Sequence, residues 1–174
     1  DKRDLEYALE SWVTHEYGEW FVIGAWKCRL HRAGHMPGAC MVEIETPTHR
    51  ILWSGDLDTR DSPNTYGAKP IECDILCLEA TYGGKNHPDR KEEESRFVSA
   101  VQKIVQRGGV VLVPAFASGR GQDILRILHR EAPHLNVHYD GMGTRLTRKW
   151  FENPQHIRDP ETLTKVWKWT KKVS

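Results

Sequence analysis

The sequence lacks a long hydrophobic run, a C-x-x-C pair and any sizeable net charge. Its longest apolar runs, such as residues 110–117, fall far short of the ~18 residues that a membrane span needs, and its N-terminus has no signal-peptide pattern. Its 25 basic and 24 acidic residues leave a net charge of +1, so no bulk field draws the chain to nucleic acid or to a membrane. These absences predict a soluble intracellular protein without a membrane partner, in which any nucleic-acid contact is local.

The four cysteines do not form a zinc-binding or disulfide framework. Cys28, Cys40, Cys73 and Cys77 each lie among apolar residues. The favoured interpretation is that they are reduced and serve as small buried hydrophobic residues. A weaker alternative places Cys73 and Cys77 on one strand, where they could bind a stray metal.

The composition is that of a globular protein, with 39% apolar and 28% charged residues. A chain of 174 residues can hold one ordinary domain or two incomplete ones. The chain opens on Asp1 within a stretch that is typical of the middle of a domain, so we expect a fragment boundary there.

Alternating patterns dominate the first half of the sequence. The first ten residues have helical spacing, whereas residues 19–45 alternate apolar and polar side chains as a half-buried strand does, with an interruption by small residues at 33–39. Three further strands are expected at "MVEIET", "RILWSGD" and "DILCLEATYG".

The second half alternates helices and strands. A helical face over residues 90–106 leads into an expected strand, "VVLVPAF", which is followed by an expected helix, "SGRGQDILRILHR". A strand at "NVHYDGM" and a helix near 143–152 complete a rhythm that is typical of parallel α/β units. The tail "KVWKWTKKVS" permits no assignment.

Three polar residues stand at the ends of expected strands. His35 lies in the small-residue run, Asp56 follows "ILWSG" and Glu79 follows "DILCL". Strand ends are where α/β folds place their sites, and imidazole and carboxylate are donors that zinc accepts. Taken singly, each residue is better explained as a hydrogen-bonded loop histidine or an acid that caps a turn.

A glycine-rich turn offers a site for phosphate. Gly119, Arg120 and Gly121 fall at the expected N-terminus of a helix, where N–H groups and the helix dipole favour an anion and a guanidinium can add a forked contact. An equally weighted alternative is that the glycines allow tight packing of the helix. Three further cationic side chains are interpreted as a solvated helix face rather than an RNA contact: His87, Arg90 and Arg96.

Taken together, these motifs resemble a known family. In order and spacing, "AGHMPGA", "ILWSGDLD", "LEATYGG", "HPDRKEEESRF", "RGGVVLVPAFASGRGQDIL" and "YDGM" resemble the metallo-β-lactamase-fold nucleases of the β-CASP family, from about Asp4 to about Asp159. The resemblance implies an α/β fold in two parts. Residues 1–83 would form the C-terminal part of a metallo-β-lactamase αββα sandwich, and residues 84–174 would form the start of a β-CASP α/β insertion domain.

The resemblance also implies roles for the three polar residues. His35 would be a terminal zinc ligand, Asp56 would bridge two Zn²⁺ ions, and Glu79 would hydrogen-bond a downstream histidine that assists the leaving group. Two zinc ions lower the pKa of a shared water, so that hydroxide can attack phosphorus. The implied activity is hydrolysis of phosphodiester bonds in RNA, with DNA as an alternative. The implied setting is a homodimer or a processing complex, in the cytoplasm or in a eukaryotic nucleus.

The sequence departs from the family pattern in its histidines. No H-x-H-x-D-H segment occurs, and none of the later histidines has the context of the two downstream motifs: His129, His134, His138 and His156. A zinc site needs about four ligands and the chain offers two, so we expect the isolated chain to be inactive. The absent N-terminal sheet would also leave one face of the remaining sheet uncovered.

Two other function classes stay open at this point. A non-catalytic homologue could act as a scaffold in an RNA-processing complex, although such a protein would be free to lose His35, Asp56 and Glu79. A plain α/β domain with structural histidines and acids is the third interpretation, and the run from Thr81 to Gln122 is too specific to favour it.

Overall fold

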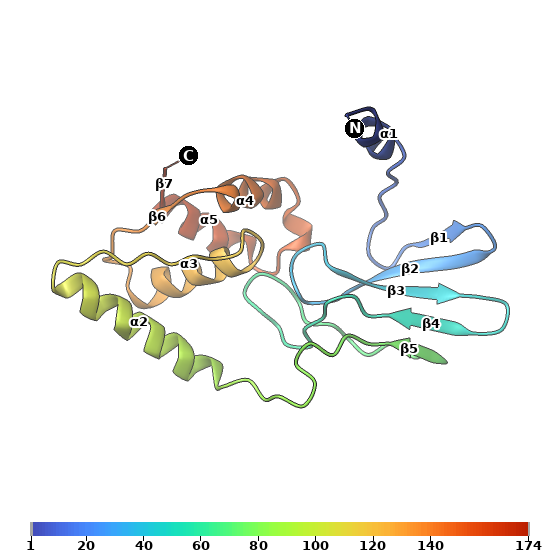
Figure 1. The fold of residues 1–174 in the computed structure, drawn as a ribbon, viewed down its shortest axis with the longest axis horizontal. Coiled ribbons are helices and arrows are strands. Elements are labelled where there is room, and N and C mark those ends of the chain that lie inside the picture. Colours follow the sequence, from blue (N-terminus) through green and yellow to red (C-terminus); the bar gives the residue numbers. More distant parts are fainter. Residues whose placement is uncertain (1, 174) are drawn as a thin grey trace.

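The computed structural model describes residues 2–173, in which a sheet is followed by a group of helices (Figure 1). The first part contains α1 (Lys2–Glu10), β1 (Trp20–Ile23), β2 (Trp26–Arg32), β3 (Cys40–Glu45), β4 (Arg50–Trp53) and β5 (Ile75–Cys77). The second part contains α2 (Arg90–Gln106), α3 (Arg120–Glu131), β6 (His138–Tyr139), α4 (Met142–Glu152), the 3-10 turn η1 (Pro154–His156), α5 (Pro160–Trp169) and β7 (Lys171–Lys172). The mixed α/β class expected from the sequence is confirmed.

The five strands of the first part form one sheet in the order β1-β2-β3-β4-β5. Neighbours are antiparallel from β1 to β4, and β5 pairs with β4 in parallel. The strands expected from period-two patterning are confirmed, although β5 covers only three residues of "DILCLEATYG". A parallel neighbour requires a crossover, and the long loop from 54 to 74 provides it.

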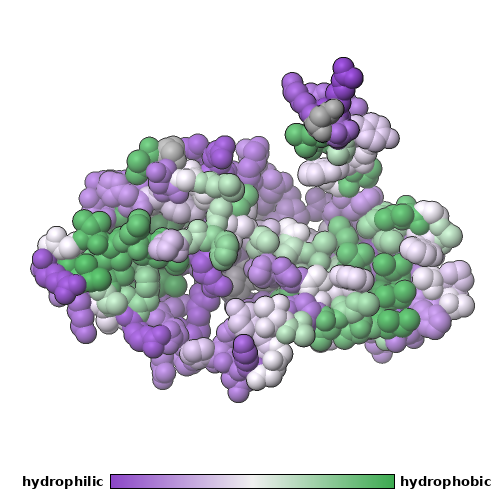
Figure 2. Space-filling model, in the orientation of Figure 1, coloured by the Kyte–Doolittle hydropathy of each residue, from purple (hydrophilic) through white to green (hydrophobic). Residues whose placement is uncertain are grey.

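One face of this sheet is apolar and largely open. Partners in register share a face, and the pairs Ile23↔Trp26, Ile44↔Ile51 and Val42↔Trp53 place hydrophobic side chains together on it. Trp26 and Trp53 are 51% and 59% exposed. Figure 2 shows hydrophobic residues gathered over the strands. The uncovered face expected from the sequence is therefore present among the described residues.

The opposite face carries a buried carboxylate. Glu43 on β3 is fully buried and accepts hydrogen bonds from both Nε and Nη2 of Arg29, at 3.0 and 2.8 Å. His31 Nε2 lies 2.6 Å from the same oxygen, and Arg50 Nε lies 3.4 Å from the other one. Burial raises the pKa of Glu43, but hydrogen bonds from His31 and Arg29 and the charge of Arg29 outweigh it and hold this pKa below its ordinary value.

Replacing Glu43 by glutamine is therefore expected to destabilise the chain by about 2 kcal/mol at pH 7, because charge-assisted hydrogen bonds are lost. The value is moderate because Arg29 and Arg50 are 30% and 44% exposed in their side chains. A carboxylate with a depressed pKa stabilises the fold above the unfolded-state pKa of about 4.3 and ceases to do so as pH falls through its folded-state pKa. Urea unfolding of parent and variant should thus give a difference that shrinks between pH 7 and about pH 3.

The control for this prediction is Glu45→Gln. Glu45 points to the same face of β3 but makes only an exposed pair with Lys27, at 3.8 Å. Its replacement should change the free energy of unfolding by less than about 0.5 kcal/mol. A Glu43→Gln effect that is the same at pH 7 and at pH 3 would contradict the assignment of the stabilisation to the ionised carboxylate.

The helices of the second part agree with the sequence, but one strand does not. The predicted helices correspond to α2, α3 and α4, and "NVHYDGM" contains the short strand β6. The expected strand "VVLVPAF" is wrong, because the segment runs extended without pairing to any strand in the described part of the chain. Its side chains at Val110, Leu112 and Phe116 are 94%, 91% and 85% exposed, and Figure 2 shows this second hydrophobic patch. A strand needs a hydrogen-bonded neighbour, and pattern alone cannot supply one.

Residues 165–173 of the tail, which permitted no assignment, contain the C-terminal half of α5 and β7, and Ser174 lies outside the described residues. Asp159 caps α5 by accepting the N–H of Thr162 at 3.0 Å, and Pro160 occupies the first turn. These are ordinary helix-start residues, so "DPET" was a usable pattern that sequence reasoning missed. Leu163 and Val166 then bury one face of α5, and β7 pairs with β6 in parallel.

The remaining sequence expectations concern cysteines and membranes. All four cysteines are free, with Cys28 buried and the others partly buried. Cys73 lies before β5 rather than on it, so the alternative of a shared strand with Cys77 is wrong. None of the helices in residues 2–173 is both long and apolar enough to cross a membrane.

Candidate functional site

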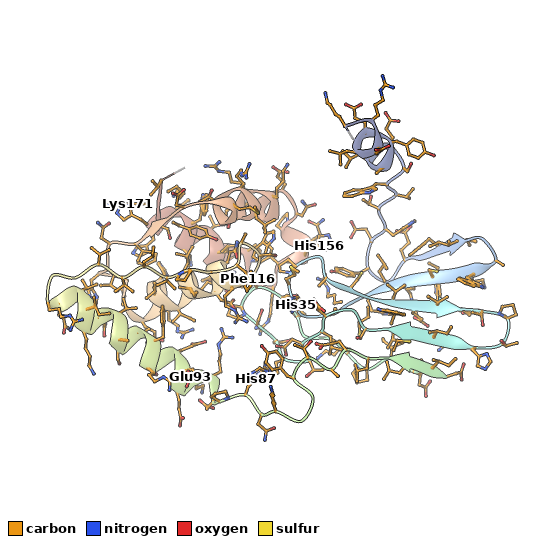
Figure 3. The ribbon with its side chains drawn as sticks, in the orientation of Figure 1. His35, His87, Glu93, Phe116, His156 and Lys171 are labelled. Atoms are coloured by element: carbon orange, nitrogen blue, oxygen red, sulfur yellow. The ribbon has the colours of Figure 1, made fainter. Side chains whose placement is uncertain are left out.

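Three strand ends bring the predicted site residues to one rim of the sheet. His35 lies in the loop between β2 and β3, Asp56 follows β4, and Glu79 follows β5. We call His35, Asp56 and Glu79 the polar rim. Figure 3 shows His35 at the junction between the sheet and the helices. The alternation of strand and loop in the sequence thus places the rim where the two parts of the chain meet.

A bridge in the backbone joins the first two members of the polar rim. Gly34 pairs with Leu57 in antiparallel fashion, which sets the following residue, His35, opposite Asp56. The N–H of Asp58 also donates to the carbonyl of Ala33, at 2.9 Å. His35 and Asp56 are both exposed, so an imidazole and a carboxylate face solvent from adjacent segments.

Glycine is required at position 34. Its φ is +76°, in the left-handed region, and a Cβ there would overlap the carbonyl oxygen of Asp58 and lie 2.8 Å from the Ala68 nitrogen. The close approach of two loops therefore explains the glycine that precedes His35.

Glu79 ties the third strand end to the second. One of its oxygens accepts the N–H of Leu57 at 3.4 Å, and the other accepts the N–H of Thr81 at 2.8 Å. Hydrogen bonds from Thr81 and from Leu57, with a smaller effect of the His35 charge, hold the pKa of Glu79 below its ordinary value. The carboxylate is ionised at neutral pH and holds the residue that follows Asp56.

The predicted phosphate-binding turn lies against the same loops. Ser118 Oγ donates to Met36 Sδ at 2.8 Å, and a Cβ on Gly119 would lie 3.9 Å from the Met36 Cβ. Gly119 has a φ of +82° and precedes α3 without a side-chain cap. The structure thus brings the turn at 118–119, from the second part of the chain, next to the residue that follows His35.

The individual residues of this turn differ in their contacts. A Cβ on Gly121 would come within 2.6 Å of the Tyr139 Oη, so this glycine permits close packing of α3 on Tyr139. The N–H groups of Arg120 and Gly121 donate to the carbonyls of Ser118 and Phe116, at 3.0 and 3.3 Å. Packing therefore explains Gly121, whereas the exposed side chain of Arg120 is free to turn toward solvent.

A buried polar cluster beside the turn was missed by sequence reasoning. Asn64, Asp123 and Arg126 are 2%, 9% and 5% exposed, and Asn64 is hydrogen-bonded to both of the others. Burial raises the pKa of Asp123, and the charges of Arg90 and Arg120 oppose that rise. One sequence signal could have indicated this cluster. Asp123 and Arg126 are charged residues on the side of the helix that also carries the apolar Leu125, Ile127 and Leu128.

The interpretation of the cationic residues near α2 needs one correction. Arg90 does not lie on a purely solvated face, because it approaches Asp123 on α3 at 3.5 Å as well as bonding Glu94. Arg96 is exposed and pairs with Glu93, as expected for a solvated helix. His87 packs against the ring of Tyr82, with 4.5 Å between centroids.

Curated proteins with similar sequences are RNA-processing nucleases. The chain is 31% identical to "RNase aCSPSF2" of Saccharolobus solfataricus over 94% of this chain and 34% of the relative, and 31% identical to "Probable RNase MJ4" of Methanocaldococcus jannaschii over 97% and 40%. It is 38% identical to the "Cleavage and polyadenylation specificity factor subunit 3" of Dictyostelium discoideum over 74% of this chain and 17% of the relative. No protein-family model matches the chain.

The chain belongs to the β-CASP family of metallo-β-lactamase-fold ribonucleases. The resemblance of the motifs, the α/β fold class and the relation to ribonucleases are thereby confirmed. The chain spans about a third of the length of the two archaeal relatives, at 34% and 40%. The β-CASP family is one of metal-dependent nucleases.

The polar rim offers side chains that suit a zinc ion, but it does not complete a metal site. Among residues 2–173, no three His, Cys, Asp or Glu side chains are grouped so that they could hold a metal ion. His35 and Asp56 of the rim supply one imidazole and one carboxylate on facing segments, which are the nitrogen and oxygen donors that zinc binds. A four-coordinate ion would need further ligands, from protein or from water.

Proposed function

We propose that this chain is the part of a zinc-dependent β-CASP ribonuclease that supplies one imidazole and one bridging carboxylate to a two-zinc centre. The observation that carries the proposal is the antiparallel bridge Gly34↔Leu57, which sets His35 opposite Asp56. Both side chains reach solvent, as ligands to a substrate-accessible metal must. The similarity to proteins named as ribonucleases supports RNA as the substrate.

Each residue of the polar rim then has a chemical task. His35 and Asp56 would hold the metal, and bound Zn²⁺ would supply a Lewis acid that activates water and neutralises charge on the phosphate. Glu79, through its bond to the Leu57 N–H, holds the Asp56 segment in place and keeps its negative charge at the rim. Carboxylate oxygens suit a bridge because each can face one ion.

The helical part of the chain would contribute to RNA binding. We assign residues 1–83 to the metallo-β-lactamase domain and residues 84–174 to the β-CASP domain, in keeping with the change from strands to helices after β5. The turn at Gly119, Arg120 and Gly121 lies next to the His35 loop, but the N–H groups of Arg120 and Gly121 donate to nearby carbonyls, so a phosphate held close to the rim would be bound by the Arg120 side chain. Arg120 offers the forked guanidinium that phosphate binding favours.

The proposal is tested with the full-length natural protein that contains this chain. A single-stranded RNA should be cleaved, cleavage should stop after dialysis against a chelator, and added Zn²⁺ should restore at least half of the rate. Loss of the metal should leave the helical content unchanged, which circular dichroism checks. Cleavage that continues at the parent rate in the metal-free protein would contradict a metal-dependent mechanism, and a full-length protein that neither binds zinc nor cuts RNA would favour the scaffold.

A further inference from the structure

Hydrogen bonds from polar groups join the two parts of the chain along a seam. From the sheet side comes the loop 58–70, and from the helical side come α3 and the residues after η1. Arg158 donates its backbone N–H to the Asn64 carbonyl at 3.1 Å and its Nη1 to the Ser62 carbonyl at 3.1 Å. A polar interface between two parts of a chain permits relative motion unless specific contacts fix it.

One side chain at the centre of this seam makes three contacts. The Asn64 amide nitrogen donates to Asp123 Oδ1 at 2.5 Å and to the Gly119 carbonyl at 3.4 Å, and its oxygen accepts from Arg126 Nε at 2.9 Å. Asn64 is 2% exposed. The side chain at this position must donate to a carboxylate and accept from a guanidinium at the same time. The amide of asparagine does both.

The partners of Asn64 are themselves held on the helical side. Arg126 Nη2 donates to the carbonyl of Asp159 at 2.6 Å, and Arg90 approaches the second oxygen of Asp123 at 3.5 Å. Asn64 therefore lies between a carboxylate and a guanidinium of α3, and each of these groups is held by a further contact with Arg90 or Asp159.

The loop that carries Asn64 is also fixed to the polar rim. The Ala68 N–H donates to the Asp58 carbonyl at 2.8 Å, and the Asp58 N–H donates to Ala33 at 2.9 Å, one residue before Gly34. Contacts thus run without a gap from the His35 loop through loop 58–70 to Asn64 and on to Gly119.

We propose that Asn64 is a positioning residue that fixes the Gly119 turn of α3 relative to the polar rim. The proposal rests on the proposed function for its catalytic consequence, because the turn and the rim would hold the phosphate and the metal. The structural consequence, a fixed seam, does not depend on any activity.

The test compares hydrogen exchange of the full-length protein with that of its variants. Asn64→Asp removes both donors and sets a second carboxylate against Asp123, so exchange should accelerate at least ten-fold in peptides that cover 58–70 and 117–126 and stay unchanged in β2, β3 and β4. The double variant Asn64→Asp/Asp123→Asn restores one carboxylate and one amide, with an acceptor toward Arg126. Its exchange should return to within three-fold of the parent.

The matched control is Ser62→Ala. Ser62 Oγ accepts the N–H groups of Asn64 and Thr65, at 3.1 and 3.0 Å, so this change loosens the loop but removes neither the Ser62 carbonyl that accepts Arg158 nor the side-chain contacts of Asn64 with α3. Faster exchange should then be confined to 58–70. If Asn64→Asp does not fold, Asn64→Ala is measured in its place with the same expected result. Unchanged exchange at 117–126, or a double variant that exchanges as fast as Asn64→Asp, would overturn the proposal.

Kinetics separate the two proposals. In an active nuclease, Asn64→Asp should lower kcat at least ten-fold with the KM for RNA within three-fold, and the double variant should recover kcat. A rise in the KM for RNA without a change in kcat would overturn the positioning role. A parent protein that does not cleave RNA refutes the proposed function, whereas the exchange experiment still decides the role of Asn64.

Discussion

Gly34→Ala is expected to destabilise the chain by about 4 kcal/mol, because it combines backbone strain with overlap of buried atoms. The φ of +76° disfavours any side chain, and the new methyl would overlap the Asp58 carbonyl oxygen and crowd the Gly67 Cα at 2.9 Å. The loops that carry His35 and Asp56 would separate. Urea unfolding monitored by tryptophan fluorescence measures the loss.

Gly38→Ala is the control for that experiment. Gly38 lies in the same loop with a φ of +90°, but no atom lies within 4 Å of a Cβ built there. It therefore incurs only the left-handed backbone cost of about 1–2 kcal/mol. Equal effects of the two substitutions would show that strain alone matters and that the contact between the loops does not.

Asp56→Asn in the full-length protein is expected to lower kcat for RNA cleavage by a factor on the order of 10³ or more, since an amide carries no charge to bridge two metal ions. Because Asp56 is exposed, the stability of the folded chain should change by less than about 0.5 kcal/mol. Zinc content measured by mass spectrometry should fall together with kcat, and the melting temperature of the metal-free protein should stay the same.

The control for the loss of activity is Asp58→Asn. Asp58 is a carboxylate two residues away, but its side chain pairs with Arg60 at 2.9 Å rather than pointing to the polar rim. Its replacement should leave kcat within about three-fold of the parent. An Asp56→Asn protein that cuts RNA as fast as the parent would remove Asp56 from the metal centre.

The helices were predictable because their information is local. The periodicity over 90–106 and the run after Gly119 correspond to α2 and α3, since a helix closes its hydrogen bonds within its own segment. The segment "VVLVPAF" has an equally clear pattern, yet it forms no strand in the described residues because its partners must come from elsewhere. α5 was missed although its capping residues were present.

The residues of the candidate site could be predicted from the sequence, whereas their contacts could not. The sequence indicated His35, Asp56 and Glu79 as polar residues at strand ends, and the comparisons support the family in which such residues are found. It gave no indication that Glu79 binds the N–H of Leu57 or that Asn64 lies between Asp123 and Arg126. These contacts join residues more than twenty positions apart, which a single sequence does not pair.

The amino-acid sequence by itself indicated α2, α3 and α4, the strands of the first sheet and the motifs that mark the β-CASP family. Only the tertiary structure decided that the His35 and Asp56 loops are bridged, that the Gly119 turn packs against them, and that an asparagine fills the polar seam. The reason is physical: helix formation depends on neighbours along the chain, whereas a site and a seam depend on which distant loops the sheet brings into contact.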